Sequence, residues 1–276
     1  VCYDVKGKCI HANEQAKQIL GVSERSMFDK KLKEWLNGKK LKDLSDAVFH
    51  EKICMDGKMH YFQFEFKKMI YEQHEIGSFF LLHDQTDEVE RVQNEQYKAN
   101  HDSLTGLYNR EYFYTQAEQM LKEHPDNEYI IACSDIRDFK IVNDVYGIKK
   151  GDDILIKQAE SLKQKTPEGC VYGRLSGDRF AILVPKELYQ ESVFRKEISR
   201  IEQIEGSSSF RLRIYMGIYE VDDRKTPVAA MCDRAVMAIK TIKDDAANRI
   251  VYYDKKLRET ALREQEIISQ FHDALN

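Results

Sequence analysis

The sequence feature that most constrains the fold is an apolar run, typical of a buried strand, that is followed closely by an aspartate. Residues 129–133 read YIIAC and lead almost directly into Asp135. From Asp102 onward, helix and strand signals alternate around this run, which predicts an α/β domain. Open α/β sheets usually hold ligands at the carboxyl ends of their strands, so Asp135 is a candidate site residue.

The expected elements of this domain follow in chain order. They are a helix that ends near Lys122, a strand at 128–135, a helix from Asp152, a hairpin around 176–178, a strand at 212–218, a helix at 227–243 and a strand at 249–253. We assign the domain to residues 102–254. A further helix is expected over 255–276, where apolar residues recur along one face.

Residues 1–86 have a different character. The aromatic and β-branched runs at 61–71 and 78–86 favour paired antiparallel strands, and Met55-Asp56-Gly57-Lys58 is a candidate hairpin turn. Residues 87–101 are charged, contain neither Gly nor Pro, and carry a short apolar stripe, which predicts a connecting helix.

Composition narrows the classes of function. A chain of 276 residues has room for two domains, and a net charge of -4 provides no basic field for nucleic acid. The six cysteines form no C-x-x-C pair, which argues against zinc and disulfides and favours a reduced, cytoplasmic compartment. No run approaches the roughly 18 apolar residues of a membrane span, so we expect no membrane contact by these residues. Because the chain begins at Val1, we interpret it as a piece of a longer protein, which could itself be membrane-attached.

Two carboxylates are candidates for one site. Asp135 ends the apolar strand, and Asp178 lies in the turn between two strands. Together with backbone N–H groups of the loop expected at 136–140, they suit Mg²⁺ carrying a polyphosphate. Spacing alone favours the simpler interpretation of Asp178 as an ordinary turn residue.

A set of motifs in fixed order adds to this evidence. They are DSLTGLYNR (102–110), SDIRDFKIVNDVYGIKKGDDIL (134–155), RLSGDRF (174–180), YMGIY (215–219) and CDRAVMAIK (232–240). Together they resemble the GGDEF family of diguanylate cyclases over residues 102 to about 253. The resemblance implies a fold like the palm domains of nucleotidyl cyclases and polymerases, in which two domains face each other and join two GTP molecules into cyclic di-GMP.

The same resemblance implies site residues. Asp135, Ile136 and Asp178 match metal-binding positions for Mg²⁺ or Mn²⁺. The implied nucleotide-binding positions are Phe139, Lys140, Asn143, Asp152 and Lys240. Asn143 and Asp152 would read the guanine edge, Phe139 and Lys140 lie in the phosphate loop, and Lys240 would bind phosphate. From the residues alone, alternatives stay open: Asn143 as a turn cap, Asp152 as a helix N-terminal residue and Lys240 as a solvated side chain.

The pattern also departs from the family. The fourth residue of the signature is Arg179, where active members have an acid, and the usual D-x-D reads Asp135-Ile136-Arg137. Arginine does not deprotonate in proteins, so it cannot act as a base or a metal ligand. At about 5 Å and an effective dielectric constant near 20, each like-charge pair costs roughly 3 kcal/mol, enough to repel a second divalent cation. We therefore expect no intact catalytic residue. Arg137 or Arg179 could instead bind phosphate in place of metal, or both could be solvated surface charges.

Two further positions differ. Pro167 and Cys170 occupy the Arg and Asp positions of the family's inhibitory R-x-x-D site, and Ala247 stands where a phosphate-contacting Arg is usual. Product feedback through that site is therefore not expected.

The flanking regions carry looser resemblances. Residues 3–21 and 81–91 resemble a PAS sensor domain, expected over 1–86, for which no cofactor is predicted because its histidines are scattered. The C-terminal segment resembles the helix that leads into an EAL phosphodiesterase domain in tandem proteins. The helix at 87–101 could pair with its copy in a homodimer.

Three functions remain, in decreasing order of support. They are a GTP-binding regulatory module in cyclic di-GMP signalling, an active diguanylate cyclase, and a structural dimerisation relay.

Overall fold

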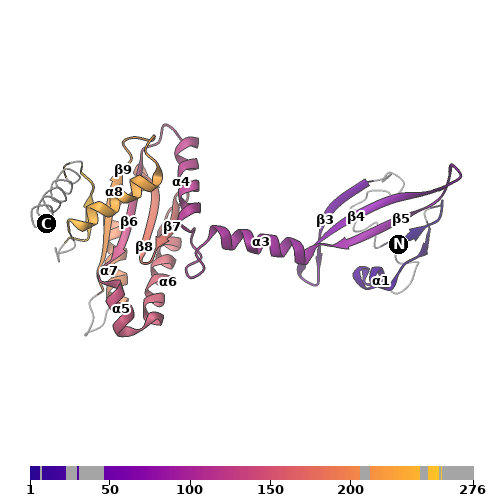
Figure 1. Ribbon diagram of the computed structural model, residues 1–276, viewed down its shortest axis with the longest axis horizontal. Helices are drawn as coiled ribbons and strands as arrows, with labels where there is room; N and C mark the ends of the chain where they lie inside the picture. Colours follow the sequence, from indigo (N-terminus) through magenta and orange to yellow (C-terminus); the bar gives the residue numbers. More distant parts are fainter. Residues whose placement is uncertain are drawn as a thin grey trace, which may run out of the picture. The chain divides into compact units, whose positions relative to one another are not determined.

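The computed structural model describes residues 1–6, 8–22, 30, 47–205, 212–242, 248–254 and 256. The chain divides into two compact units, Val1–Gln96 and Tyr97–Asn276, and each has its own five-stranded sheet (Figure 1). The helix expected over 255–276, and Ala247 with the altered segment around it, lie outside the described residues, apart from Lys256.

The N-terminal unit is an antiparallel sheet in the order β2-β1-β5-β4-β3. Its elements are β1 (Cys2–Tyr3), β2 (Cys9–His11), α1 (Glu14–Leu20), β3 (Ala47–Met55), β4 (Lys58–Tyr71) and β5 (His74–Asp84). Phe62, Phe64 and Phe66 alternate along β4 and are buried on one face, as the period of two in a half-buried strand requires. The expected antiparallel pairing of the aromatic strands is thus confirmed.

The β3–β4 connection is the two-residue hairpin turn expected at 55–58. Met55 pairs with Lys58, and Asp56 and Gly57 have φ of 50° and 78°. Two successive positive φ angles match the twist of a hairpin, and Gly adopts them without strain.

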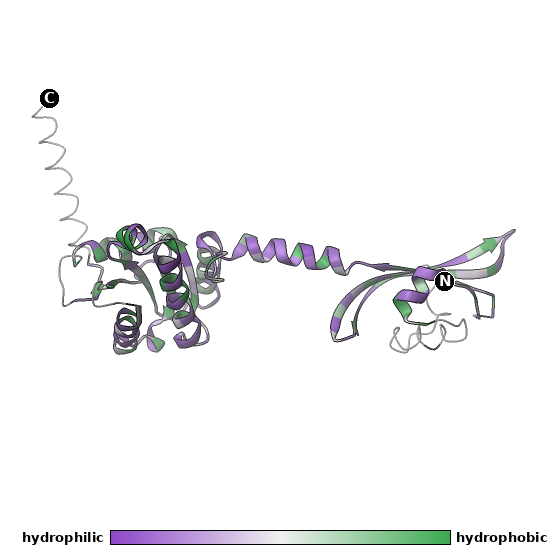
Figure 2. Cartoon of the chain, turned by 90° about the horizontal axis from the view of Figure 1, so that it is seen from below, coloured by the Kyte–Doolittle hydropathy of each residue, from purple (hydrophilic) through white to green (hydrophobic). Residues whose placement is uncertain are grey.

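Helix α3 (Thr86–Asn100) follows β5. It is hydrophilic over most of its surface (Figure 2), and Val92 and Tyr97 of its apolar stripe are exposed. The ring of Tyr97 stacks on His101, and the expected dimer rests on the remaining exposed surface of this stripe.

The C-terminal unit has the sheet order β10-β9-β6-β8-β7. Its strands are β6 (Tyr129–Ile136), β7 (Val171–Ser176), β8 (Arg179–Pro185), β9 (Ile214–Glu220) and β10 (Ile250–Tyr252). Its helices are α4 (Arg110–Glu123), α5 (Phe139–Tyr146), α6 (Ile148–Lys165), α7 (Glu191–Glu205) and α8 (Val228–Lys240), with a short 3-10 turn at Lys186–Leu188. Strand β6 is central and antiparallel to β8 and β9, whereas β10 is parallel to β9.

Helices cover both faces of this sheet (Figure 2). Ala132 belongs to the core on the α6–α7 face, and its neighbour Cys133 to the core on the α4–α8 face. An apolar run covered on both sides is what residues 129–133 predict. All eight residues of β6 are buried, so the mixed α/β fold holds Asp135 in a rigid central strand.

Two sequence expectations need correction, and one further helix was not expected. Residues 139–140 are the first turn of α5 and not part of a loop, because Asp138 adopts a left-handed φ of 54° that turns the chain into the helix at once. Helix α6 begins at Ile148, four residues before Asp152. Helix α7 was not among the expected elements.

Over the described ranges, none of the helices combines the length and apolar character that crossing a bilayer requires.

Candidate functional site

Asp135 lies at the end of β6 and is buried, with 6% of its surface exposed. It is paired with Tyr215 of β9 on one side, and its predecessor Ser134 is paired with Phe180 of β8 on the other. Two neighbouring strands therefore fix the direction of its carboxylate.

Asp178 lies at the tip of the β7–β8 hairpin, next to Gly177, whose φ is 53°. Its Oδ2 atom accepts a hydrogen bond of 2.7 Å from the backbone N–H of Ile136. This bond ties the hairpin tip to the end of β6, so the structure brings Asp178 to Asp135 and Ile136 as the sequence predicts.

The two acids influence each other. Burial raises the pKa of Asp178, and the negative charge of Asp135 raises it further, against the opposing effects of the Ile136 hydrogen bond and of Arg179. Two carboxylates that repel each other in a partly buried site favour a bound cation.

Arg179 provides such a cation from the chain itself. Its Nε atom lies 3.4 Å from Asp135 Oδ2; the arginine side chain is 45% exposed and the aspartate side chain 8%. The carboxylates alone have the hard oxygen atoms that Mg²⁺ or Mn²⁺ prefers, but the guanidinium occupies one of them. The guanidinium therefore competes with a divalent ion for Asp135, and among the described residues no group of three or more His, Cys, Asp or Glu side chains is arranged to hold a metal ion.

Arg137, the second arginine near the end of β6, contacts Tyr215 and Asp138. Its pKa is raised by a hydrogen bond with Tyr215 and, against some desolvation, by its neighbour Asp138, whose Oδ2 lies 3.3 Å from Nε. Arg137 therefore lies beside the site but pairs with other groups.

Asn143 of α5 lies against Gly151 of α6, the residue before Asp152. A Cβ atom built on Gly151 would lie 1.9 Å from Asn143 Oδ1, so the absence of a side chain at residue 151 allows the amide to lie against α6. Asn143 Oδ1 is buried and has no hydrogen-bond partner among the described residues. Buried polar atoms are nearly always hydrogen-bonded, so an unpaired acceptor next to Gly151, the residue before the half-buried Asp152, indicates a ligand or water with a donor.

The remaining predicted residues lie on two parts of the unit, the first turn of α5 and the end of α8. Phe139 is half-buried against the core, Lys140 is exposed in the first turn of α5, and Lys240 is exposed at the last residue of α8.

One network received no role in the sequence analysis. Arg174 Nη1 donates to Asp102 Oδ1 at 2.9 Å, and its Nε donates to the carbonyl of Gly177 at 2.9 Å. Asp102 also accepts from the N–H and hydroxyl of Thr105. The turn after α3 is therefore bonded to the tip that carries Asp178. The signal was present, since Asp102 and Arg174 each begin a motif.

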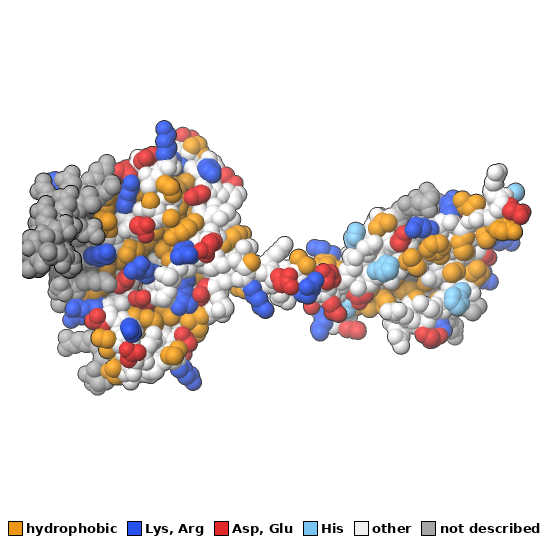
Figure 3. Space-filling model, in the orientation of Figure 1, with side chains coloured by type: hydrophobic (Ala, Val, Ile, Leu, Met, Phe, Trp, Pro, Cys, Tyr) orange, Lys and Arg blue, Asp and Glu red, His pale blue; other side chains and the backbone are white. Residues whose placement is uncertain are grey.

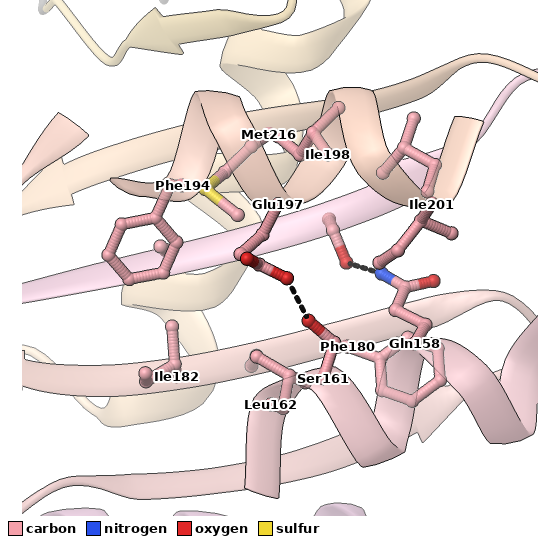
Figure 4. A pocket seen from close by; sticks show the side chains of 14 residues that line it. Gln158, Ser161, Leu162, Phe180, Ile182, Phe194, Glu197, Ile198, Ile201 and Met216 are labelled. Atoms are coloured by element: carbon pink, nitrogen blue, oxygen red, sulfur yellow. Dashed lines mark hydrogen bonds between the residues drawn. The ribbon is translucent and has the colours of Figure 1, made fainter. Parts of the chain in front are cut away.

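A small interior cavity lies behind these strands, between the sheet and helices α6 and α7 (Figure 4). Its volume is about 50 Å³ and its lining is mostly apolar, with polar contacts from Gln158 to Ser134 and from Ser161 to Glu197. That volume suits water molecules and not a nucleotide. This cavity is therefore not the candidate nucleotide site, which rests on Asp135, Asp178, Asn143 and Asp152.

The visible face of the C-terminal unit mixes acidic and basic side chains (Figure 3). No single sign of charge dominates this face, so recognition of an anion depends on individual side chains at the site.

These features define an α/β domain with an acidic site at the end of its central strand and a polar pair on the two helices that follow. A family model described as the diguanylate cyclase GGDEF domain matches residues 99–249. The match covers more than half of the chain, and the chain therefore belongs to the GGDEF family.

Several characterised proteins are similar to this chain. It is 28% identical to diguanylate cyclase DgcM of Escherichia coli K12 over 62% of this chain and 42% of DgcM. It is 26% identical to the bifunctional diguanylate cyclase/cyclic di-GMP phosphodiesterase MucR of Pseudomonas aeruginosa over 64% of this chain and 27% of MucR. The chain thus spans less than half the length of these relatives.

Among solved structures, the chain is similar to the coiled coil and GGDEF domain of DgcB from Caulobacter crescentus in complex with c-di-GMP. The two chains are 23% identical and superpose with a TM-score of 0.49, over 61% of this chain and 95% of the DgcB chain.

Proposed function

We propose that this GGDEF domain binds GTP as a regulatory module of cyclic di-GMP signalling and condenses it weakly or not at all. The observation that carries the proposal is the ion pair between Arg179 and Asp135. The pair places a permanent cation on Asp135, the carboxylate that family resemblance assigns to metal binding. Arg179 also stands where active family members have the acid that would complete the catalytic set.

Guanine recognition is supported by the Asn143 amide. Its buried Oδ1 accepts no hydrogen bond from the part of the chain that the structure describes, and the 2-amino group of guanine is a donor that adenine lacks. The Asp152 carboxylate, one residue beyond Gly151, can accept from the same edge of the base. We expect GTP to bind more tightly than ATP, since the adenine edge would leave these acceptors without donors.

The expectation of Mg²⁺ or Mn²⁺ between Asp135 and Asp178 stays a prediction, which Arg179 modifies. Because the guanidinium already neutralises Asp135, we propose that GTP binding depends only weakly on the divalent ion. Guanidinium groups bind phosphate oxygens in a fork geometry, so Arg179 can take the phosphate-binding role itself. Phe139 and Lys140 at the start of α5, with Lys240, complete the proposed phosphate-binding residues.

The test measures GTP binding and turnover by the 276-residue chain. The chain is titrated calorimetrically with GTP and with ATP, once in the presence of Mg²⁺ and once with EDTA. We expect EDTA to weaken the affinity for GTP less than threefold, which corresponds to a change in binding free energy of about 0.6 kcal/mol. Incubation with GTP and Mg²⁺ or Mn²⁺, followed by chromatography, is expected to give little or no cyclic di-GMP. Turnover at the rate of an ordinary enzyme, on the order of 1 s⁻¹ or more, would show an active cyclase instead.

Two variants separate the alternatives. Arg179→Glu restores an acid at the fourth signature position and should increase both the Mg²⁺ dependence of binding and any cyclic di-GMP formed. Arg110→Glu makes the same charge change at an exposed residue of α4 and should alter neither. If neither GTP nor ATP binds to any form, the structural relay is the correct function.

The proposal extends to the parts around this domain. The antiparallel sheet and helix α1 support a PAS-like sensor in the N-terminal unit, and the exposed stripe on α3 supports a homodimer. The relative MucR is described as both a diguanylate cyclase and a cyclic di-GMP phosphodiesterase. This description supports the proposal of an EAL phosphodiesterase domain in the intact protein. Sedimentation velocity of the chain tests the dimer, because a monomer at micromolar concentration would contradict it.

A further inference from the structure

A second pocket, which we call the turn pocket, lies in the C-terminal unit beneath the turn that follows α3. Its volume is about 260 Å³. Its lining includes His101 and Tyr108 of this turn, Lys163 of α6, Cys170 just before β7 and Tyr172 within β7. None of them belongs to the proposed GTP site.

The wall of the turn pocket is aromatic and held in place. The ring of His101 stacks on Tyr97 with centroids 3.9 Å apart and contacts Tyr108 at 5.2 Å. Tyr108 also packs edge-on against Tyr112 at 4.8 Å. Because each ring is fixed by another, the wall does not need to reorganise to accept a flat ligand.

The charge of the turn pocket is positive. Lys163 Nζ donates one hydrogen bond, of 3.0 Å, to the Thr105 carbonyl, and an ammonium group has three donors. The described residues that line the pocket include no Asp or Glu, and burial raises the pKa of the Cys170 thiol to about 11, so this side chain stays neutral. The nearest acid of the turn, Asp102, is already paired with Arg174.

We propose that the turn pocket binds a small aromatic carboxylate, with its ring against Tyr108 and Tyr172 and its carboxylate on Lys163. A cavity of roughly 150 Å³ accepts benzene. The larger volume here leaves room for one ring and a carboxylate, whereas a nucleoside triphosphate is too large.

The occupant would act on the hairpin tip through a short path. The Tyr108 carbonyl accepts a hydrogen bond of 2.9 Å from the backbone N–H of Arg174. The side chain of Arg174 in turn bonds to Gly177, the residue before Asp178. A ligand that fixes Tyr108 therefore stabilises the tip, which gives the domain a regulatory input separate from the N-terminal unit.

The test uses benzoate as the probe and titrates it into the 276-residue chain, with binding followed by ligand-observed NMR and calorimetry. Cyclohexanecarboxylate keeps the charge without a π face, and benzyl alcohol keeps the ring without the charge. Benzoate is expected to bind at least tenfold more tightly than either, a difference of about 1.4 kcal/mol. Amide hydrogen exchange at 176–179 is expected to slow when benzoate is bound.

Variants locate the site. Lys163→Gln and Tyr172→Leu should each weaken benzoate binding about tenfold, whereas Lys165→Gln, an α6 lysine outside the turn pocket, should leave it unchanged. Lys163 is exposed, so its variant folds even if Tyr172→Leu does not. Absence of benzoate binding at millimolar concentration, equal binding of the three probes, or binding insensitive to Lys163→Gln would each overturn the proposal. None of these readouts requires GTP.

Discussion

Arg179 Nε lies 3.4 Å from Asp135 Oδ2, and the pair joins a half-exposed guanidinium to a carboxylate that is only 8% exposed. Removing one partner of a fully buried ion pair costs about 3–5 kcal/mol, and solvent around Arg179 reduces this cost. We expect Arg179→Ala to lower the free energy of unfolding by about 1–2 kcal/mol, measured by urea denaturation at pH 7.

The matched control is Arg110→Ala, which removes an exposed arginine paired with an exposed glutamate. Such pairs contribute about 0–1 kcal/mol, so this change should be close to neutral. If the two substitutions lower the free energy of unfolding equally, burial of Asp135 does not strengthen its ion pair with Arg179.

Gly151 gives a second prediction. A methyl group at this position would lie 1.9 Å from Asn143 Oδ1 and must displace the amide. We expect Gly151→Ala to weaken GTP binding about three- to tenfold, the effect of one lost hydrogen bond of about 0.5–1.5 kcal/mol. Titration calorimetry measures this change.

Stability should respond less than binding, because Ala favours the helix by about 1 kcal/mol over Gly and offsets part of the local strain. Asp153→Ala, at the exposed neighbouring position of α6, controls for a change in the helix alone. GTP affinity that is unchanged by Gly151→Ala would remove Asn143 from the proposed guanine site.

The pKa of Asp178 predicts a pH dependence. Burial and the Asp135 charge raise this pKa above its ordinary value of 3.8, so ionisation of Asp178 opposes folding. The stability that the protonated acid contributes is present below pH 3.8 and is lost as the pH rises through the folded-state pKa. We therefore expect Asp178→Asn, whose side-chain oxygen can still accept from Ile136, to be more stable than wild type at pH 7. Denaturation curves between pH 3 and 7 should show this advantage disappear toward low pH, and an advantage that grows toward low pH would contradict it.

Much of the C-terminal fold could be predicted from local patterns. The apolar run at 129–133 predicts a central strand, and the motif order predicts the family. The first turn of α6 was missed because Gly147 and Gly151 weaken a helix signal, and α7 was missed although Phe194, Ile198 and Ile201 recur at helical spacing.

The candidate site could likewise be predicted only in part from the sequence. Position at a strand end and in a turn nominated Asp135 and Asp178, whereas Asn143 and Asp152 were nominated by the family resemblance. Their partners depend on contacts distant in sequence, such as Asp178 with Ile136 and Arg174 with Asp102. The periodicity of a single strand or helix carries no information about such contacts.

Substitution of Asp102 is predicted to change the stability in the opposite direction to substitution of Asp178. Burial alone would raise its pKa, but hydrogen bonds from Thr105 and Arg174 outweigh burial and lower it below its ordinary value of 3.8. A lowered pKa contributes stability that is present above pH 3.8 and is lost as the pH falls through the folded-state pKa. We expect Asp102→Asn to destabilise the protein at pH 7 by about 1.5–3 kcal/mol, the range for hydrogen bonds to a charged group.

This deficit should shrink toward low pH, where wild-type Asp102 is also protonated. Measured in the same buffers, the stability differences of Asp102→Asn and Asp178→Asn from wild type must therefore have opposite signs at pH 7. Both variants report on the same hairpin tip through Gly177 and Ile136. If both shift stability in one direction, the tip responds to loss of charge in general, and the separate electrostatic roles of these two aspartates are wrong.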